Sequence, residues 1–159
     1  DLPRAELARI ALALGADVPF FVNGEPAIAR GIGERLTAVT LPPFWVAVIA
    51  PPIVVPTATI FAAPELTRNS AWAKMDVFSE GYGRNDLQPI AVARFSAIAT
   101  ALTMLRERSG CARMTGSGSC VFALFATEGE ARGAVEARPA AMQGFVARTL
   151  ARHPLAGFA

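Results

Sequence analysis

Histidine, cysteine and lysine are scarce in this chain, and each scarcity excludes a class of function. The 159 residues include one histidine and two cysteines, and fourteen of the fifteen basic residues are arginine. His153 has no second His or Cys at ligand spacing, so we expect neither a metal site built on imidazole nor Ser-His-Asp catalysis. Two cysteines cannot supply the framework of a disulfide-stapled secreted domain. We interpret Cys111 and Cys120 as core thiols rather than as a redox pair.

Charge is also sparse and evenly spread. The formal net charge is +2, and 18% of the residues are charged against 53% that are hydrophobic. The arginines are scattered rather than gathered in a stripe, which argues against a nucleic-acid or membrane partner. The composition predicts a soluble cytoplasmic protein with one domain or two small lobes. The chain starts at Asp1 without a signal sequence, and we expect it to be a piece of a longer protein.

One stretch of 29 residues, Leu36 to Pro64, carries no formal charge and is long enough to suggest a membrane span. Six prolines within it argue against that reading. Each removes a backbone donor and restricts the residue before it, so no unbroken helix of about 20 residues can form. We interpret Phe44 to Ala50 as a buried strand flanked by loops.

Local sequence patterns predict that the first half of the chain is mostly strand after one helix. Apolar periodicity that ends at a glycine predicts a helix, and a proline among aromatic and β-branched residues predicts an extended segment. Two short runs separated by glycines predict a hairpin, whose sheet the strand at 44–50 would extend. In chain order these segments are the helix 4–14, the extended segment 18–22, and the hairpin strands 26–31 and 35–40.

The second half is mostly helical and ends in short strands. Residues 65–84 are polar and weakly periodic, which indicates an irregular excursion of the kind found near binding sites. Ser96 can cap one of the helices and Gly110 can end it. The predicted elements are helices at 85–95 and 96–109, strands at 112–115 and 120–126, a helix at 128–138 opened by the capping box Thr127 with Glu130, and a strand at 144–151. This order predicts an α+β sandwich of the ferredoxin-like kind, with helices on one face of an antiparallel sheet.

The sharpest local motif is TGSGSC at 115–120. Two glycines alternate with two serines, which allows backbone angles at which successive N–H groups converge on an anion. Such a loop can hold a phosphate group. The alternative is a glycine-rich hairpin turn with no ligand.

Other candidate residues each have two interpretations. Asp17 lies between an Ala/Leu-rich helix and VPFFV, where burial would disfavour its charged form unless a cation or N–H donors held it. Alternatively, it satisfies backbone donors at a turn. Phe61 offers a ring that stacks on a base or packs in the core. Asn85 and Asp86 are most simply helix caps.

Six segments occur here in one order: LGADVPFFVNG, GIGERL, TATIFAAPELTRN, NDLQP, RMTGSGSCVFA and GFVAR. Over essentially all 159 residues the chain resembles the GHMP kinases, and among them the family that phosphorylates 4-diphosphocytidyl-2-C-methyl-D-erythritol in non-mevalonate isoprenoid biosynthesis. The resemblance implies an α+β fold of the GHMP kinase type. Residues 1–40 would be the remainder of an N-terminal ribosomal-protein-S5-like domain, and residues 41–159 the ferredoxin-like C-terminal domain.

The same resemblance implies roles for single residues in an ATP-dependent transfer assisted by Mg²⁺. Asp17 would take the proton of the substrate hydroxyl, paired with a lysine from near the N-terminus of the complete protein. Phe61 would stack on the cytosine, and Thr57 would lie near the diphosphate or methylerythritol end of the substrate. The family motif that borders the phosphates matches Gly116, Ser117, Gly118 and Ser119.

The family's long glycine- and serine-rich loop, which cradles the ATP phosphates, has no match in this chain. Phosphoryl transfer depends on such clamps, so we expect the isolated chain to be inactive without the missing N-terminal half of the same protein. Two alternatives remain at this stage. One is a GHMP kinase acting on homoserine, mevalonate or a sugar, which would lack the Phe61 segment. The other is a non-catalytic ferredoxin-like binding module. The sequence leaves the oligomeric state open.

Overall fold

The structure, a computed structural model, describes residues 2–70 and 83–154. The chain divides into two compact units, Asp1–Pro43 with Leu150–Ala159 and Phe44–Thr149. The predicted domains, residues 1–40 and 41–159, rest on the family resemblance and stay a prediction. Most of the predicted excursion at 65–84, namely 71–82, lies outside the described residues.

The first unit begins with two helices. α1 (Arg4–Leu14) confirms the predicted helix, and the N–H of Gly15 donates to the carbonyl of Ala11 at its end. The predicted extended segment at 18–22 is wrong, because Val18–Asn23 form the helix α2. Pro19 stands in the first turn of α2, where a missing N–H breaks no helical hydrogen bond. Proline here therefore begins a helix.

A two-stranded antiparallel sheet follows, and it confirms the predicted hairpin. Its strands are β1 (Ala27–Arg30) and β2 (Arg35–Ala38). In the turn between them, Gly33 has φ +112°, and a Cβ there would collide with the carbonyl oxygen of Ala16. Glycine is needed at this position for two reasons, the backbone angle and the close approach of the α1–α2 connection.

The hairpin turn also holds a carboxylate. The N–H groups of Glu34 itself and of Ile32 donate to the Glu34 carboxylate, the latter at 2.7 Å, and with Arg35 nearby they hold the pKa of this carboxyl below its ordinary value. A lowered pKa means that the interaction stabilises the folded state above the unfolded-state pKa. The contribution is lost as the pH falls through the folded-state pKa.

The second unit is built on a four-stranded sheet in the order β4-β5-β3-β6, with every neighbouring pair antiparallel. Its strands are β3 (Trp45–Ala50), β4 (Ala112–Met114), β5 (Val121–Phe125) and β6 (Gln143–Arg148). This is the strand order of the split βαβ, ferredoxin-like arrangement, as predicted. The prediction that β3 extends the hairpin sheet is wrong, because β5 and β6 occupy both of its edges.

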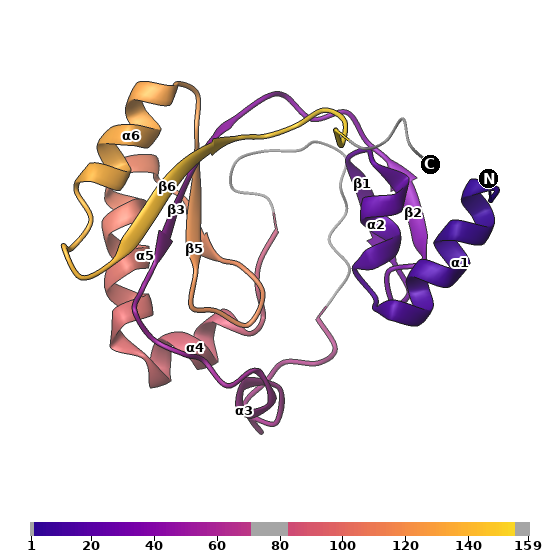
Figure 1. Ribbon diagram of the computed structural model, residues 1–159. Helices are drawn as coiled ribbons and strands as arrows, with labels where there is room; N and C mark the ends of the chain where they lie inside the picture. The colour runs from indigo at the N-terminus through magenta and orange to yellow at the C-terminus, as the bar shows by residue number, and fades with distance from the viewer. Residues whose placement is uncertain (1, 71–82, 155–159) are drawn as a thin grey trace. The chain divides into compact units, whose positions relative to one another are not determined.

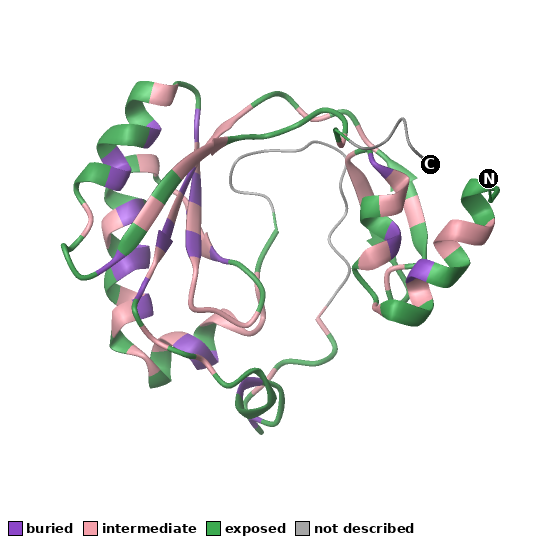
Figure 2. Ribbon diagram, in the orientation of Figure 1, coloured by how far each residue is buried: buried purple, intermediate pink, exposed green. Residues whose placement is uncertain are grey.

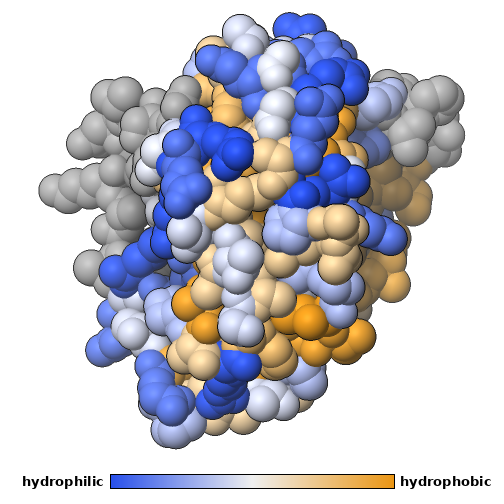
Figure 3. All heavy atoms as spheres, turned by 90° about the vertical axis from the view of Figure 1, so that its left-hand side faces the viewer, coloured by the Kyte–Doolittle hydropathy of each residue, from blue (hydrophilic) through white to orange (hydrophobic). Residues whose placement is uncertain are grey.

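Two helices cover one face of this sheet, α5 (Ser96–Ser109) and α6 (Glu128–Glu136) (Figure 1). Each of the two helices carries buried residues, coloured purple in Figure 2. On α5 these are Ile98, Ala101, Leu102 and Leu105. The spacing i, i+3, i+4, i+7 therefore marks the inner face correctly. The outer side of this layer, turned toward the viewer in Figure 3, mixes polar and apolar residues.

On the two covering helices, two predicted ends are confirmed and one is wrong. Gly110 ends α5 at φ 71°, and Thr127 with Glu130 forms the capping box of α6. The predicted cap at Ser96 is wrong: Phe95 is the capping residue, and Ser96 already lies inside the helix. A serine inside the first turn cannot place its hydroxyl on the free N–H groups in the way that a capping residue does.

Two further helices, both short, lie before α5 in the described part of the unit. α3 (Thr57–Phe61) follows β3 in a region predicted as mostly strand, and α4 (Gln88–Arg94) begins three residues later than predicted. Within residues 2–70 and 83–154, no single helix is long and apolar enough to cross a membrane. α4 and α5 reach the length and composition only together, and they meet at a bend of 118°.

The two ends of the second unit are bonded to each other. The N–H of Phe44 donates to the Thr149 hydroxyl at 2.8 Å, and the N–H of Thr149 donates to the Phe44 carbonyl at 2.9 Å. One residue further in, the Arg148 guanidinium lies over the Trp45 ring, 5.8 Å from its centre. The chain thus enters and leaves this unit at one point.

Candidate functional site

The Gly-Ser loop, residues 115–119, joins β4 to β5 in a tight turn. The N–H of Gly118 donates to the Thr115 carbonyl at 3.1 Å, and the N–H of Thr115 donates to the Cys120 carbonyl at 3.0 Å. Gly116 and Gly118 have φ +54° and +96°, which favours glycine. In the described part of the chain, the N–H groups of Gly116, Ser117 and Ser119 donate to no acceptor. Free N–H groups in such a loop can bind an anion.

Two of the predicted site residues lie in contact. The hydroxyl oxygens of Thr57 and Ser117 are 2.8 Å apart, although 60 residues separate them in the chain. The hydroxyl of Ser119 also donates to the Pro51 carbonyl at 3.2 Å. The Gly-Ser loop is therefore bonded to Pro51, which directly follows β3, and to Thr57, the first residue of α3.

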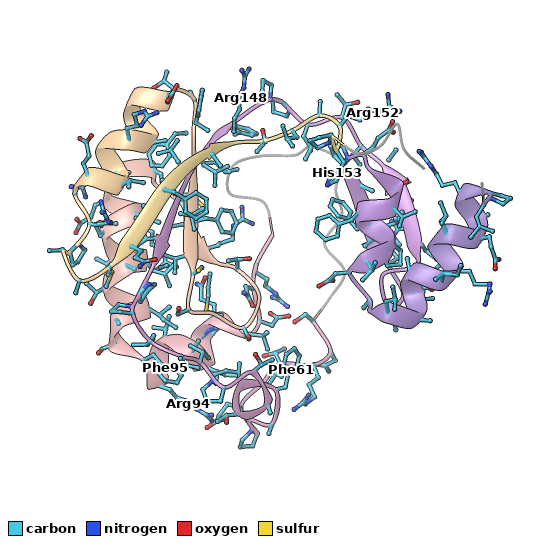
Figure 4. All side chains as sticks on the ribbon, viewed as in Figure 1. Phe61, Arg94, Phe95, Arg148, Arg152 and His153 are labelled. Carbon is cyan, nitrogen blue, oxygen red and sulfur yellow. The ribbon has the colours of Figure 1, made fainter. Side chains whose placement is uncertain are left out.

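Phe61 is the last residue of α3, and its side chain is 50% exposed. The carbonyls at this end of the helix are held by two arginines: Arg68 donates to the Phe61 carbonyl at 2.5 Å, and Arg94 donates to the Thr59 carbonyl at 3.1 Å. Figure 4 shows Phe61 and Arg94 in this part of the second unit. The ring is not a core side chain, so it remains available for a planar ligand.

Asp17 belongs to the first unit, at the residue before α2. Its side chain is exposed, which corrects the expectation of burial. It makes no capping hydrogen bond to α2, so the alternative of a carboxylate used up by backbone donors is wrong as well. No described residue forms a hydrogen bond or ion pair with this carboxylate that would oppose a chemical role.

Asn85 and Gln88 are functional candidates that the sequence reasoning missed. The Asn85 amide nitrogen donates to the carbonyls of Met114 and Gly116, at 2.9 and 2.7 Å. The Gln88 amide oxygen accepts the N–H of Met114 at 2.8 Å. Both side chains thus hold the start of the Gly-Ser loop. No periodicity or motif predicts this contact, because a lone Asn before a helix is most simply interpreted as a cap.

The predicted helix caps at Asn85 and Asp86 are only partly correct. Asn85 accepts the N–H of Leu87 at 3.0 Å just ahead of α4, while Leu87 is the capping residue itself. Asp86 instead forms an ion pair with Arg84 at 2.8 Å and accepts the Ser70 hydroxyl at 2.6 Å. It is therefore committed to neighbouring side chains rather than to the helix.

A cavity of about 480 Å³ adjoins these residues, and three arginines contribute to its lining. Asn85 and Gln88 line it too, whereas the predicted substrate residues and the Gly-Ser loop do not. The arginines are Arg84, Arg106 and Arg113. The cavity therefore belongs to the surroundings of α4 and β4, and not to the predicted site.

Metal-binding side chains do not gather in the described residues, where no group of three or more His, Cys, Asp or Glu residues could hold an ion. Cys111 and Cys120 are free thiols, each half-buried. The prediction of core thiols is therefore wrong, because neither belongs to the buried core. His153 lies in the first unit, with its N–H bonded to the Gly24 carbonyl and its ring packed on the edge of Phe21.

Known proteins match this chain along nearly its whole length. It is 54% identical to a 4-diphosphocytidyl-2-C-methyl-D-erythritol kinase of Thiobacillus denitrificans over 99% of this chain and 56% of the relative. It is 51% identical to the protein of the same name from Cupriavidus necator, again over 99% and 56%. The chain spans about half the length of the curated relatives it matches.

A solved structure and a family model agree with these relatives. A crystal structure of 4-(cytidine 5'-diphospho)-2C-methyl-D-erythritol kinase, 31% identical in sequence, superposes with a TM-score of 0.72 over 89% of this chain and 56% of that one. The model of the GHMP kinases C terminal domain matches residues 62–144, which include α4, α5, α6 and the Gly-Ser loop. The chain therefore belongs to the GHMP kinases, and its α+β fold is of the GHMP kinase type.

Proposed function

We propose that this chain is the C-terminal part of a kinase that transfers the γ-phosphoryl group of ATP to the 2-hydroxyl of 4-diphosphocytidyl-2-C-methyl-D-erythritol, in isoprenoid precursor synthesis in the cytoplasm. The observation that carries the proposal is the Gly-Ser loop, whose Gly116, Ser117 and Ser119 N–H groups donate to no described residue, and which is bonded through Ser117 to Thr57. The similarity to relatives and to a solved structure named for this substrate supports it.

Asp17 is proposed as the general base. Its exposed carboxylate takes the proton of the substrate hydroxyl while the hydroxyl oxygen attacks the γ-phosphorus and the bond to ADP breaks. The phosphoryl group moves to the substrate, and the proton stays on the carboxyl group until product release. A carboxylate that forms no hydrogen bond or ion pair with a described residue can accept a proton in this way.

The Gly-Ser loop is proposed to donate hydrogen bonds from its backbone to phosphate oxygens. Backbone N–H groups fixed in a turn stabilise negative charge without reorganising, and this is the main contribution that a protein makes to phosphoryl transfer. Thr57, bonded to Ser117, lies at the same place and is proposed to contact the phosphate or methylerythritol end of the substrate.

Phe61 is proposed to stack on the cytosine ring. Stacking uses the face of an aromatic side chain, and half of this side chain is exposed at the end of a helix that the buried Ile60 anchors. This residue distinguishes the proposed substrate from homoserine, mevalonate or a sugar, which offer no aromatic base.

Magnesium assists phosphoryl transfer when it is bound, mainly through phosphate oxygens and water. The described residues include no group suited to hold it, and we assign no residue of this chain to the ion. The loop that cradles the ATP phosphates, and a lysine beside Asp17, are proposed to come from the rest of the protein. The isolated chain is therefore expected to have no turnover.

The first test replaces the proposed base. In the complete kinase, Asp17→Asn is expected to lower kcat by about 10²- to 10⁴-fold, the usual loss when a general base is removed. Steady-state kinetics with ATP and the cytidine substrate measure this, and a thermal melt checks folding. Glu25→Gln, which removes one exposed carboxylate from the same unit, is the matched control. Near-normal turnover by Asp17→Asn would remove this residue from the chemistry.

A further inference from the structure

Asn85 and Gln88, at the start of α4, hold the Gly-Ser loop through hydrogen bonds. Three hydrogen bonds join the two side chains to the backbone at Met114 and Gly116, all between 2.7 and 2.9 Å. A fourth, from the N–H of Leu87 to the Asn85 amide oxygen, fixes the amide itself. Met114 is 2% exposed and lies in the core, so these hydrogen bonds connect the loop to the rigid part of the unit.

The identity of each amide atom follows from its partners. The Asn85 atom that faces two carbonyl oxygens must be the nitrogen, since two acceptors cannot bond to each other. The Gln88 atom that faces the N–H of Met114 must be the oxygen. Asn85 therefore acts on the loop as a donor, and Gln88 as an acceptor.

The hydrogen bond from Asn85 to the Gly116 carbonyl also sets the direction of the next N–H group in the chain, that of Ser117. The peptide unit is planar, and in its usual trans form the carbonyl of Gly116 and the N–H of Ser117 point in opposite directions. Pulling the Gly116 carbonyl toward Asn85 turns the Ser117 N–H away from Asn85. That N–H is one of three in the loop, with those of Gly116 and Ser119, that donate to no acceptor within the described residues.

We propose that Asn85 is a positioning residue that aims the Ser117 N–H at a phosphate oxygen of a bound substrate, with Gln88 holding the preceding strand in register. The inference rests on the proposed function, in that it takes the Gly-Ser loop to be a phosphate site. Two sources offer the same chemistry, the phosphates of ATP and the diphosphate of the cytidine substrate, and both enter the test.

The donor and acceptor roles give a matched pair of variants in the complete kinase. Asn85→Asp keeps the size of the side chain but places a carboxylate against two carbonyl oxygens. Gln88→Glu keeps an acceptor for the Met114 N–H. We expect Asn85→Asp to lower kcat/KM about 10- to 100-fold, the loss typical of a hydrogen bond to a charged group. Gln88→Glu is expected to lose less than Asn85→Asp, because its bond is kept. The control is Gln143→Glu, the same change of amide to carboxylate at an exposed residue of β6, which is expected to stay within about threefold of the unchanged protein.

The direction of the loss identifies the ligand. A rise in KM for ATP with an unchanged KM for the cytidine substrate assigns the Ser117 N–H to the nucleotide, and the reverse assigns it to the diphosphate of the acceptor. The pH profile gives a signature that a merely structural role would not. A protonated carboxyl group regains one O–H donor, so the Asn85→Asp variant is expected to recover toward the unchanged protein as the pH falls.

A second readout does not depend on turnover. Amide hydrogen exchange at Ser117, measured in the complete protein, is expected to slow when ADP or the cytidine substrate is added, and not to slow in Asn85→Asp. If the variant does not fold, Asn85→Ser, which keeps a single donor, is expected to show an intermediate effect. Equal kinetics and equal exchange for Asn85→Asp and the unchanged protein would overturn the proposal.

The same measurements separate this inference from the proposed function. A complete protein that does not phosphorylate the cytidine substrate, while Asn85→Asp still abolishes the slowing of exchange by ADP, contradicts the proposed function and supports the positioning role. Normal turnover with no effect of Asn85→Asp supports the proposed function and contradicts the positioning role.

Discussion

Ile60 and Phe61 are neighbours in α3, and their surroundings are opposite. Ile60 is fully buried, whereas the Phe61 side chain is 50% exposed. In a helix, consecutive side chains point about 100° apart, so a buried residue anchors the helix and leaves its neighbour free to face a ligand. Arg68 and Arg94 hold the carbonyls at this end. The exposure of an aromatic ring is thus built into the helix rather than left over from poor packing.

We predict that Phe61→Ala weakens binding of the cytidine substrate without weakening the fold. In the complete kinase, KM for this substrate is expected to rise about 5- to 150-fold, which corresponds to the ~1–3 kcal/mol of one base-stacking contact. KM for ATP and the melting temperature should change little, because the ring is half exposed. Phe145→Ala, with a side chain 58% exposed on β6, is the matched control. Equal KM changes in the two variants would contradict the stacking role.

At the level of secondary-structure elements, the first unit depends on one close approach. The turn of the β1–β2 hairpin packs against the α1–α2 connection, where Gly33 meets the backbone of Ala16. Asp17 follows directly. A change in the hairpin turn would therefore move the residue before α2, although the turn carries no proposed catalytic group.

We predict that Gly33→Ala destabilises the first unit by about 1–3 kcal/mol, since the residue must leave φ +112° or push the Ala16 carbonyl away. Gly15→Ala is the control in the same unit: its backbone is extended, and a new Cβ would make only an ordinary contact, 3.5 Å from Val18. Denaturant unfolding, followed by circular dichroism, measures both variants. If Gly33→Ala lowers the free energy of unfolding no more than Gly15→Ala does, the turn accommodates a Cβ without strain, and the prediction is wrong.

The elements that the sequence predicted correctly are those whose signals are local. Gly110, the capping box at Thr127 and the spacing of Ile98 to Leu105 act within one or two turns of a helix. The α2 helix was missed because Pro19 resembles a helix breaker, whereas proline in the first turn is compatible with a helix. The position of β3 between β5 and β6 depends on partners about 75 to 100 residues away, which no local pattern reports.

The candidate site shows the same difference between local signals and contacts between distant residues. TGSGSC and the Phe61 segment are short motifs, and the sequence indicated both. The contact of Thr57 with Ser117 spans 60 residues, and the hydrogen bonds of Asn85 reach Met114 and Gly116, 29 and 31 residues away. A lone Asn beside a helix has several common uses, and only the folded chain distinguishes them.

At the scale of the molecule, the described part of the second unit forms a fold of its own. Its four strands and two covering helices share one core, and its first and last residues, Phe44 and Thr149, are hydrogen-bonded. The proposed base Asp17 belongs to the other unit, and the ATP loop is proposed to lie in the remainder of the protein. The chemistry that we propose is therefore assembled from parts that are not contiguous in the sequence.

We predict that residues 44–149 fold without the rest of the chain. A thermal melt of this segment, followed by circular dichroism, is expected to give one cooperative transition, because the core of the sheet lies entirely within it. Phe44→Gly with Thr149→Gly, which removes the Thr149 hydroxyl from the closure of the ends, is expected to lower the midpoint and keep the transition cooperative. A broad, non-cooperative melt of the unchanged segment would show that its stability depends on the first unit.

The hydrogen-bonded ends of this unit have a consequence for its connectivity. A short peptide bridge from Thr149 to Phe44 would close the backbone into a ring without displacing a strand, and new termini could then be opened at an exposed turn. Because its two ends meet, this unit can be inserted into a surface loop of a host protein as readily as it can be fused to a terminus.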